Sequence, residues 1–470
     1  MNLASLIAGK PVSGSGTLTI RSPYNGVEVG TVAMATRRDV DLAVAAAGAF
    51  RETPDRHQRA EILEKTRAAL ETRREEFART ISSEAGLALR EGRYEVGRTI
   101  DVLRFAAMEA LRDDGQIFSC DVSAQGKPRK IFSTREPLRC ALAITPFNHP
   151  LNQVAHKVAP AIAAGTPLIL KPSEKTPLTA LKFAELLYAA GLPGAMLSVL
   201  LGPTPEVAEP LVQHPAVEVV AFTGSVAIGK RIAATAGYKK LVLELGGNDP
   251  LIVLQDADLD LAVMLAAEGS FRNSGQRCTA VKRILAEESI AAEFTARLIE
   301  KTKEYVCGDP MDEQTRVGTV IDESSAIALE TVIREAVAAG AKVLIGGERR
   351  GALLHPTVIA NVPRDCRMVV CESFGPLAPI LTVRDLDDAL TVANATAYGL
   401  SSGVVTANLH SALKAIRALR CGTVNINEVP GFRIESSPFG GIKDSGLGVK
   451  EGVIEAIKAY SFVKTFSLPW

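Results

Sequence analysis

The chain has 470 residues, which is too long for one compact core and indicates two or three domains. Its 53 basic and 53 acidic residues give zero net charge, and 47% of its residues are hydrophobic, as in ordinary globular proteins. This balance gives no electrostatic case for nucleic acid or an anionic membrane as a partner.

The N-terminal sequence MNLASLIAGKPVSGSG lacks the basic region and the full apolar segment of a secretory signal. No uncharged apolar run reaches the roughly 18 residues that a membrane-spanning helix needs. Seven cysteines are scattered along the chain, which predicts free thiols in a reducing compartment, so we expect a cytoplasmic protein. There is no CxxC pair or HExxH motif and the six histidines are dispersed, so we expect no metal site.

The apolar pattern of residues 38–113 predicts helices. The segments VDLAVAAAGAF, RAEILEKTRAALETRREEFARTI and VGRTIDVLRFAAMEAL repeat apolar residues at i, i+3 and i+4. The next segment, 117–139, alternates loosely around Gln125-Gly126-Lys127-Pro128 and predicts a long projecting hairpin. A polar hairpin with little core of its own is typical of an interface element.

From residue 140, apolar runs alternate with amphipathic segments, which predicts parallel sheets with helices on both faces. The first series of predicted strands is CALAIT, PLILK, LSVLLG, VEVVAFTG and KLVLELGG. A second series begins near residue 249 with PLIVL, KRILA, AKVLIGG, APILTV, SGVVT and GTVNIN. The C-terminal AYSFVKTFSLPW predicts an edge strand or an exchanged strand.

One cysteine has an unusual setting. In FRNSGQRCTA, Cys278 follows Gly275 closely and adjoins Arg277. A neighbouring cation favours the thiolate, which is the nucleophilic form of cysteine. The alternative is a helix end that happens to carry a cysteine, and the residues alone leave both interpretations open.

Two further side chains suit acid–base or oxyanion chemistry. LELGGNDP places Glu244 between leucines before a Gly-Gly turn, and an apolar setting raises a carboxyl pKa toward that of a general base. An ion-paired residue at a strand end is the alternative. In ITPFNHPLNQ, Asn148 lies between two prolines and could donate a rigid amide N–H to an oxyanion. Ordinary turn chemistry is the alternative there.

Two segments suit a nucleotide. VVAFTGSVAIGKRI turns at Gly224 and Ser225 into a helix, which exposes N–H groups to phosphate, although its spacing matches neither GxGxxG nor a P-loop. LILKPSEKTP ends a strand with Lys171 and Glu174, and an acid there accepts from ribose hydroxyls and repels a 2′-phosphate. The alternatives are a plain strand-to-helix turn and a helix start with Ser173 as N-cap.

Taken together and in this order, these segments resemble the aldehyde dehydrogenase family. The shared motifs are TPFNHP, LKPSE, FTGS, LELGG, GQRC, ESFGP and PFGGIKDSG. The resemblance implies an α/β fold with two parallel-sheet, Rossmann-like domains, a projecting β oligomerisation element, and a homodimer or homotetramer. The implied segments are 1–119 and 141–246 (first and second parts of the NAD-binding domain), 120–140 (oligomerisation hairpin), 247–447 (catalytic domain) and 448–470 (C-terminal oligomerisation strand).

The resemblance also implies roles for single residues. Cys278 matches the nucleophile that forms a thiohemiacetal and then a thioester, and Asn148 matches the oxyanion donor. Glu244 matches the base that activates water, which argues against the coenzyme-A-acylating branch and for a free carboxylate product. Glu174 favours NAD, with NADP as an alternative. The residues expected to bind the cofactor are Thr145, Pro146, Phe147, Lys171, Ser173, Glu174, Phe222, Thr223, Gly224, Ser225, Leu245, Gly246, Glu372 and Phe374.

The cations predict a small anionic aldehyde as substrate. Arg277, His149 and Arg98, with Arg433 as a fainter candidate, suit phosphonate-like oxygens, and Thr279 adjoins the nucleophile. A solvated helix charge is the alternative for Arg98. The set is similar to that of the phosphonoacetaldehyde dehydrogenases, so we expect oxidation of phosphonoacetaldehyde to phosphonoacetate. Lactaldehyde, glyceraldehyde 3-phosphate, sulfoacetaldehyde and succinate semialdehyde are alternative substrates, and a non-catalytic NAD-binding protein is the alternative function.

Overall fold

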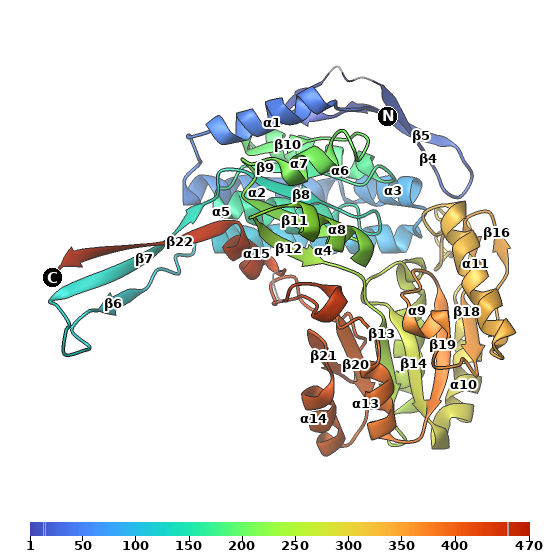
Figure 1. Cartoon of the computed structure of the whole chain (residues 1–470). Helices are drawn as coiled ribbons and strands as arrows, with labels where there is room; N and C mark the ends of the chain where they lie inside the picture. The colour runs from blue at the N-terminus through green and yellow to red at the C-terminus, as the bar shows by residue number, and fades with distance from the viewer. Residues whose placement is uncertain (13, 15, 449–450) are drawn as a thin grey trace.

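The computed structural model describes residues 1–12, 14, 16–448 and 451–470. Residues 13 and 15, in the predicted first segment, and residues 449 and 450, in the predicted last segment, lie outside the described residues. Two large sheets form separate lobes, and a narrow β arm projects from the first lobe (Figure 1). All seven cysteines are free, as the sequence predicts. No helix among the described residues is long and apolar enough to cross a membrane.

The first sheet has seven strands in the order β12-β11-β8-β9-β10-β2-β3. The strands are β2 (Leu6–Ile7), β3 (Lys10–Pro11), β8 (Ala141–Ile144), β9 (Leu168–Lys171), β10 (Leu197–Val199), β11 (Val219–Thr223) and β12 (Lys240–Glu244). Strands β8 to β12 are parallel. The chain moves outward from β8 to β10 and then returns to the other side of β8. Ligands of open α/β sheets bind beside the carboxyl ends of the strands at such a reversal.

Helices cover both faces of the first sheet. Alternate residues of its strands point to opposite faces, and they pack into two separate hydrophobic clusters. Ala141 and Ala143 of β8 pack into one cluster, and Leu142 and Ile144 pack into the other. The helices that follow these strands are α5 (Asn152–Ala164), α6 (Pro177–Ala189), α7 (Ala208–Gln213) and α8 (Val226–Thr235), with a 3-10 turn at Gly194–Met196. Burial on both faces explains the continuous apolar runs in the sequence.

The second sheet has the order β15-β18-β19-β14-β13-β20-β21, with β15 antiparallel to β18. Its strands are β13 (Asp249–Val253), β14 (Val281–Glu287), β15 (Lys342–Ile345), β18 (Thr357–Ala360), β19 (Leu377–Val383), β20 (Ser401–Val405) and β21 (Thr423–Ile426). The helices are α9 (Leu259–Phe271), α10 (Glu288–Thr302), α11 (Glu323–Ala338), α12 (Arg367–Val370), α13 (Leu386–Asn394) and α14 (Leu409–Ala418). A small hairpin joins β16 (Arg349–Arg350) to β17 (Leu353–Leu354).

The N-terminal region differs from the sequence prediction in two ways. Three strands that the sequence did not indicate, β1 (Asn2–Ala4), β4 (Thr17–Arg21) and β5 (Glu28–Ala33), form a separate sheet. The helices are α1 (Arg37–Ala49), α2 (Arg56–Thr72), α3 (Arg74–Ala85) and α4 (Leu89–Ala110). The predicted helical segment 59–81 is therefore divided between two helices, because the backbone leaves helical geometry at Arg73 (φ −102°, ψ 20°). Both halves pack on one core, so the apolar spacing conceals the break.

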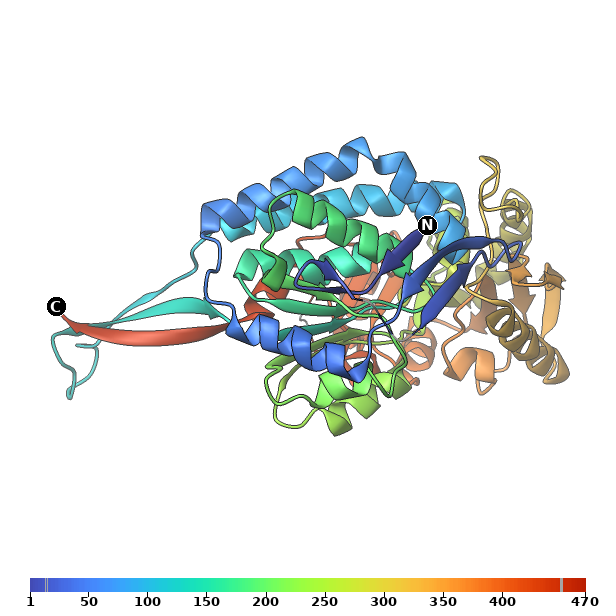
Figure 2. The same ribbon diagram turned by 90° about the horizontal axis from the view of Figure 1, so that it is seen from above.

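The arm is a three-stranded antiparallel sheet of β6 (Ile117–Ser119), β7 (Arg129–Pro137) and β22 (Ser461–Pro469), which confirms the predicted hairpin. Figure 2 shows it projecting far beyond the body. Helix α15 (Val453–Ala459) leads into β22, which pairs along its whole length with β7 of the same chain. Exposed Phe462, Val463, Phe466 and Leu468 suit contact with another surface, and oligomerisation through the arm stays a prediction.

One buried guanidinium ties the second sheet to its helices. Arg283 on β14 is only 1% exposed and donates to the carbonyls of Asn248 (2.9 Å), Val392 (2.9 Å) and Ala393 (3.1 Å). We predict that Arg283→Met leaves these carbonyls without donors and lowers the free energy of unfolding by about 3 kcal/mol. Differential scanning calorimetry should show a lower Tm. The control, Arg297→Met on exposed α10, should cost less than about 1 kcal/mol, and equal Tm values for the two variants would contradict the prediction.

Candidate active site

A left-handed turn places Cys278. Helix α9 ends at Phe271, and the next residues include Asn273 (φ 56°), Ser274 (φ 52°) and Gly275 (φ 68°). A Cβ on Gly275 would lie 2.0 Å from the carbonyl oxygen of Gly375, so only glycine fits there. Such backbone costs about 1–3 kcal/mol per non-glycine residue and persists only where the surroundings enforce it. The Asn-Ser-Gly pattern tolerates positive φ and is the one local signal in the sequence for this turn.

Asn148, which follows β8 in the first sheet, is bound to this turn. Its side-chain N–H donates to the Gln276 carbonyl at 2.9 Å, and the Asn273 amide donates to the Asn148 carbonyl at 3.0 Å. The backbone N–H of Cys278 has no acceptor within the described part of the chain. Asn148 and Cys278 line the same cavity. Both can therefore donate to an oxygen on a carbon bound to Cys278.

Glu244 ends β12 and is only 3% exposed. Neither carboxylate oxygen has a hydrogen-bond partner of good geometry among the described residues, so Glu244 is not the ion-paired strand end that the sequence left open. Burial, followed by the nearby carboxylate of Glu451, raises the pKa of Glu244 well above its ordinary value, while the charges of Lys157 and Arg433 oppose the shift. Glu244 lines one cavity with Cys278, where a carboxylate of raised pKa is a stronger base toward water.

Burial outweighs the effect expected of Arg277 on the Cys278 thiol, although the charges of the two side chains do interact. Burial raises the pKa of the Cys278 thiol to about 11, and Lys282 is the leading charge that opposes this shift. The Arg277 guanidinium instead donates to the carbonyls of Glu268 (3.0 Å) and Gly269 (2.6 Å). The resting nucleophile is therefore a neutral thiol at neutral pH.

A cavity opens beside Cys278 at the reversal point of the first sheet. The rings of Phe147 and Phe374 meet edge to face in it, with centroids 5.9 Å apart. Its lining includes predicted cofactor residues from the loops after β8, β11 and β12, together with two from the second sheet: Pro146, Phe147, Thr223, Gly224, Ser225, Leu245, Gly246, Glu372 and Phe374. The structure therefore brings most of the predicted cofactor residues together.

The shape and chemistry of this cavity fit a dinucleotide. Helix α8 begins directly after Ser225 with an exposed first turn, which suits a pyrophosphate. A Cβ on Gly246 would lie 2.1 Å from the Glu372 carboxylate, so a side chain there would close the approach. Beyond β9, Lys171 and Glu174 form a 2.6 Å ion pair in which the Glu174 side chain is 40% exposed and accessible to ribose hydroxyls.

Three predicted cofactor residues lie elsewhere. Phe222 is buried within β11, and its ring packs under Gly224 rather than lining the cavity. Thr145 is 4% exposed and donates its N–H to the Lys171 carbonyl. Ser173 does not cap a helix, because its hydroxyl accepts from the Lys175 N–H and α6 begins only at Pro177. These residues shape the loops that carry the cavity wall.

A second cavity holds charged groups from both sheets on the other side of Cys278. Its lining includes the predicted substrate residues Arg98, His149, Arg277, Thr279 and Arg433. Arg98 makes a two-point contact with Glu435, at 2.5 and 3.2 Å, and Glu435 also contacts His156 at 2.5 Å. The ring of His149 lies 3.5 Å from the buried Glu95 carboxylate. Arg98 and His149, which the sequence analysis ranked above Arg433, therefore face protein carboxylates.

Two arginines of this cavity make no ion pair with a carboxylate among the described residues. The guanidinium of Arg433 lies 4.0 Å above the Phe439 ring, and its Nη1 is buried with no hydrogen-bond partner among them. Arg277 binds only backbone carbonyls. Arg272, which the sequence analysis missed, is paired with Glu91 at 3.0 Å. Across the described ranges, no cluster of three His, Cys, Asp or Glu side chains is placed to hold a metal ion.

The raised pKa of Cys278 has a direct chemical consequence. Below its pKa of about 11, the thiolate fraction grows about tenfold per pH unit. We predict that alkylation of Cys278 by iodoacetamide accelerates continuously from pH 7 to pH 10 in the protein without nucleotide. Mass spectrometry of the Cys278 peptide gives the rate, with Cys278→Ser as the blank. A plateau below pH 9 would show that the thiolate is stabilised instead.

The chain is similar in sequence and in structure to known aldehyde dehydrogenases. The model of the aldehyde dehydrogenase family matches residues 12–466. The chain is 40% identical over 442 residues to the 3-sulfolactaldehyde dehydrogenase of Priestia aryabhattai, covering 94% of this chain and 92% of that protein. It is 39% identical over 410 residues to the sulfoacetaldehyde dehydrogenase of Neptuniibacter caesariensis, covering 87% and 89%. The NADP-dependent glyceraldehyde-3-phosphate dehydrogenase from Bacillus halodurans superposes with a TM-score of 0.97 at 34% identity, covering 100% and 99%.

Proposed function

The chain belongs to the aldehyde dehydrogenase family and oxidises aldehydes with NAD or NADP, and we propose that its substrate is a short aldehyde with an anionic head group. The predicted family, α/β fold and enzyme class are confirmed, which sets aside a non-catalytic protein. The observation that carries the substrate proposal is Arg433, which lines the cavity that contains Cys278, makes no ion pair among the described residues and has an enclosed Nη1 without a hydrogen-bond partner there.

In the proposed reaction, Cys278 loses its proton as it attacks the aldehyde carbon and forms a thiohemiacetal. The Asn148 amide and the Cys278 N–H hold the oxygen that becomes negative. A bound dinucleotide supplies the acceptor for the hydride, and a thioester remains on Cys278. Glu244 then takes a proton from the water that attacks the thioester, which releases a carboxylate and the free thiol. Glu244 supports this hydrolytic route over transfer to coenzyme A.

The charges of the cavity favour an anionic substrate. The enclosed Nη1 of Arg433 has no acceptor among the described residues, although the Glu435 and Glu451 carboxylates lie near enough to interact with its charge. A substrate anion supplies that acceptor through charge-assisted hydrogen bonds. Arg277 adds a second positive charge, which binds backbone carbonyls and makes no ion pair among the described residues. Arg98 and His149 act as support in this proposal, since Glu435 and Glu95 already face them.

Sulfonate and phosphonate are the head groups we favour. Phosphonoacetaldehyde is a candidate because the predicted cationic side chains resemble those of the phosphonoacetaldehyde dehydrogenases. Sulfoacetaldehyde and 3-sulfolactaldehyde are candidates because two relatives bear the names of dehydrogenases for these aldehydes. Each head group is tetrahedral with three oxygens and suits a guanidinium fork. Lactaldehyde, which has no charge, is the second candidate because relatives of that name are 38% identical to this chain.

Removal of the Arg433 charge tests the substrate class. We predict that Arg433→Met lowers kcat/KM for phosphonoacetaldehyde and sulfoacetaldehyde by about 30-fold or more, since a charged hydrogen bond contributes about 2 kcal/mol, and leaves propanal nearly unchanged. The assay is NADH or NADPH formation over a panel that includes lactaldehyde, glyceraldehyde 3-phosphate and succinate semialdehyde. Arg350→Met, on the exposed strand β16, is the control. An equal loss with propanal would mean that Arg433 supports Cys278 or Glu244 rather than the head group.

A second experiment tests the role of Glu244. Glu244→Gln keeps the shape of the side chain and removes the base, so acylation should proceed while hydrolysis slows by about 100-fold or more. Stopped-flow absorbance should then show a burst of about one NADH per active site, followed by slow turnover. Cys278→Ala should give no burst. A Glu244→Gln enzyme with wild-type turnover would rule out Glu244 as the base.

A further inference from the structure

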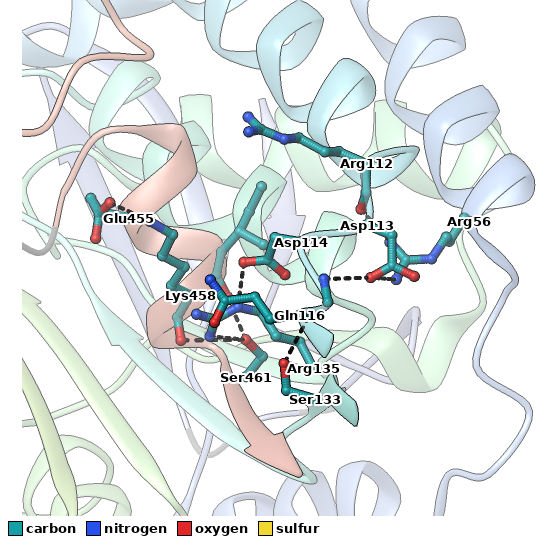
Figure 3. A network of polar contacts seen from close by, with 12 residues as sticks. Arg56, Arg112, Asp113, Asp114, Gln116, Ser133, Arg135, Glu455, Lys458 and Ser461 are labelled. Atoms are coloured by element: carbon teal, nitrogen blue, oxygen red, sulfur yellow. Dashed lines mark hydrogen bonds and ion pairs between the residues drawn. The ribbon is translucent and has the colours of Figure 1, made fainter. Parts of the chain in front are cut away.

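A cavity of about 190 Å³ lies at the base of the β arm, and Cys278 is not among its lining residues. Helices α2, α4, α5 and α15 and strand β7 all contribute to its wall, so the cavity joins the arm to the body. Figure 3 shows charged side chains gathered here, with Arg56 and Arg112 on one side and Lys458 and Arg135 on the other. Nothing in the proposed reaction uses these groups.

The central feature is Arg59, a buried arginine on α2. Its side chain lines the cavity, the residue is 9% exposed, and its Nε is enclosed without a hydrogen-bond partner. No described residue accepts a hydrogen bond from this guanidinium. Its Nη1 lies 2.5 Å from the position that a Cβ on Gly165 would take, at the carboxyl end of α5. The helix end offsets the charge only in part, and arginine stays protonated, so the site is short of negative charge.

Two further arginines lie near the cavity. Arg112 lies 3.5 Å from Glu109, which is longer than a good charged hydrogen bond, and its side chain is exposed. Exposed pairs of this kind contribute little, so the Arg112 guanidinium can turn toward an incoming anion. Arg56 is held more firmly, because it donates to the Arg112 carbonyl at 2.5 Å and lies 3.6 Å from Asp113.

The opposite wall is more firmly fixed. Arg135 holds Asp114 at 2.8 Å and Lys458 holds Glu455 at 2.8 Å. These carboxylates balance their own partners, so Asp55 at the start of α2 is the negative charge that acts on Arg59, and it makes no ion pair with it. The apolar side chains of Ile454 and Ile457 complete the wall beside Lys458 and give room for a few carbon atoms.

We propose that this cavity binds a phosphate group, either as inorganic phosphate or as the phosphoryl end of a small metabolite, with Arg59 as the central ligand. Arg112 closes over the exposed oxygens, Arg56 adds positive charge beside it, and charge-assisted bonds of a guanidinium fork suit a phosphate better than a monovalent ion. A volume of about 190 Å³ accommodates phosphate and a short carbon chain.

Titration calorimetry at constant ionic strength tests this site with two probes, inorganic phosphate and glycerol 3-phosphate. We expect Arg59→Met to weaken phosphate binding by about tenfold or more and Arg112→Met to weaken it several-fold. Arg433→Met removes a cation near Cys278 and serves as the matched control, so its phosphate affinity at the arm site should stay unchanged. Tighter binding of glycerol 3-phosphate would assign the site to a metabolite, and equal or weaker binding would assign it to free phosphate. Aldehyde turnover by Arg59→Met should equal that of the wild type.

Three results would overturn the proposal. The first is the absence of phosphate binding to the wild type outside the Arg433 site. The second is equal phosphate affinity in the wild type and in Arg112→Met, which has an exposed side chain and serves as the test if Arg59→Met does not fold. The third is a change of oligomeric state in Arg59→Met, measured by light scattering, with no change in phosphate affinity. That outcome would assign the cavity to a contact with a second copy of the chain.

Discussion

A charge enclosed by protein is tolerated only when another group compensates it, and the organisation of this chain follows from that constraint. Lys157 meets Glu451 at 2.6 Å, and Lys282 meets Glu372 at 2.7 Å, all within the interior between the two sheets. Glu244 departs from this pattern beside Cys278, because neither of its oxygens has a hydrogen-bond partner among the described residues, and Arg433 in the same cavity makes no ion pair there. Unsatisfied buried polar atoms lower stability, so Glu244 and Arg433 are not explained by packing. Their presence in one cavity with Cys278 is typical of an active site.

The reactive groups come from different sheets, so their alignment depends on the joint between the lobes. Asn148 follows β8 and Glu244 ends β12 in the first sheet, whereas Cys278 precedes the central strand of the second. The reciprocal bonds of Asn148 with Gln276 and Asn273 cross that joint. Because the left-handed turn is strained, it needs contacts from both lobes to keep its backbone conformation. Relative movement of the sheets would therefore displace the thiol from its oxyanion donors before it changed the core of either lobe.

The sequence predicted what depends on local pattern and failed where distant segments meet. Apolar runs identified the long buried strands, but the N-terminal strands of two to six residues are too short to show a period. The motif residues around Cys278 were found because the chemistry requires those residue types. The cation set was misjudged because Glu435, which neutralises Arg98, lies 337 residues away. Arg277 is adjacent to Cys278 in the sequence, but its guanidinium donates to backbone carbonyls of α9. Adjacency in sequence therefore did not predict where its charge lies.

The same enclosure that raises the pKa of Cys278 also raises that of Glu244, and the two shifts belong together. With a thiol pKa of about 11, the neutral thiol predominates at pH 7, so attack requires loss of the proton during the reaction. An anionic head group on Arg433 would cancel one of the charges that now favour the thiolate. The raised basicity of Glu244 serves the later step, because a carboxylate of raised pKa is a better acceptor for a proton from the water that attacks the thioester.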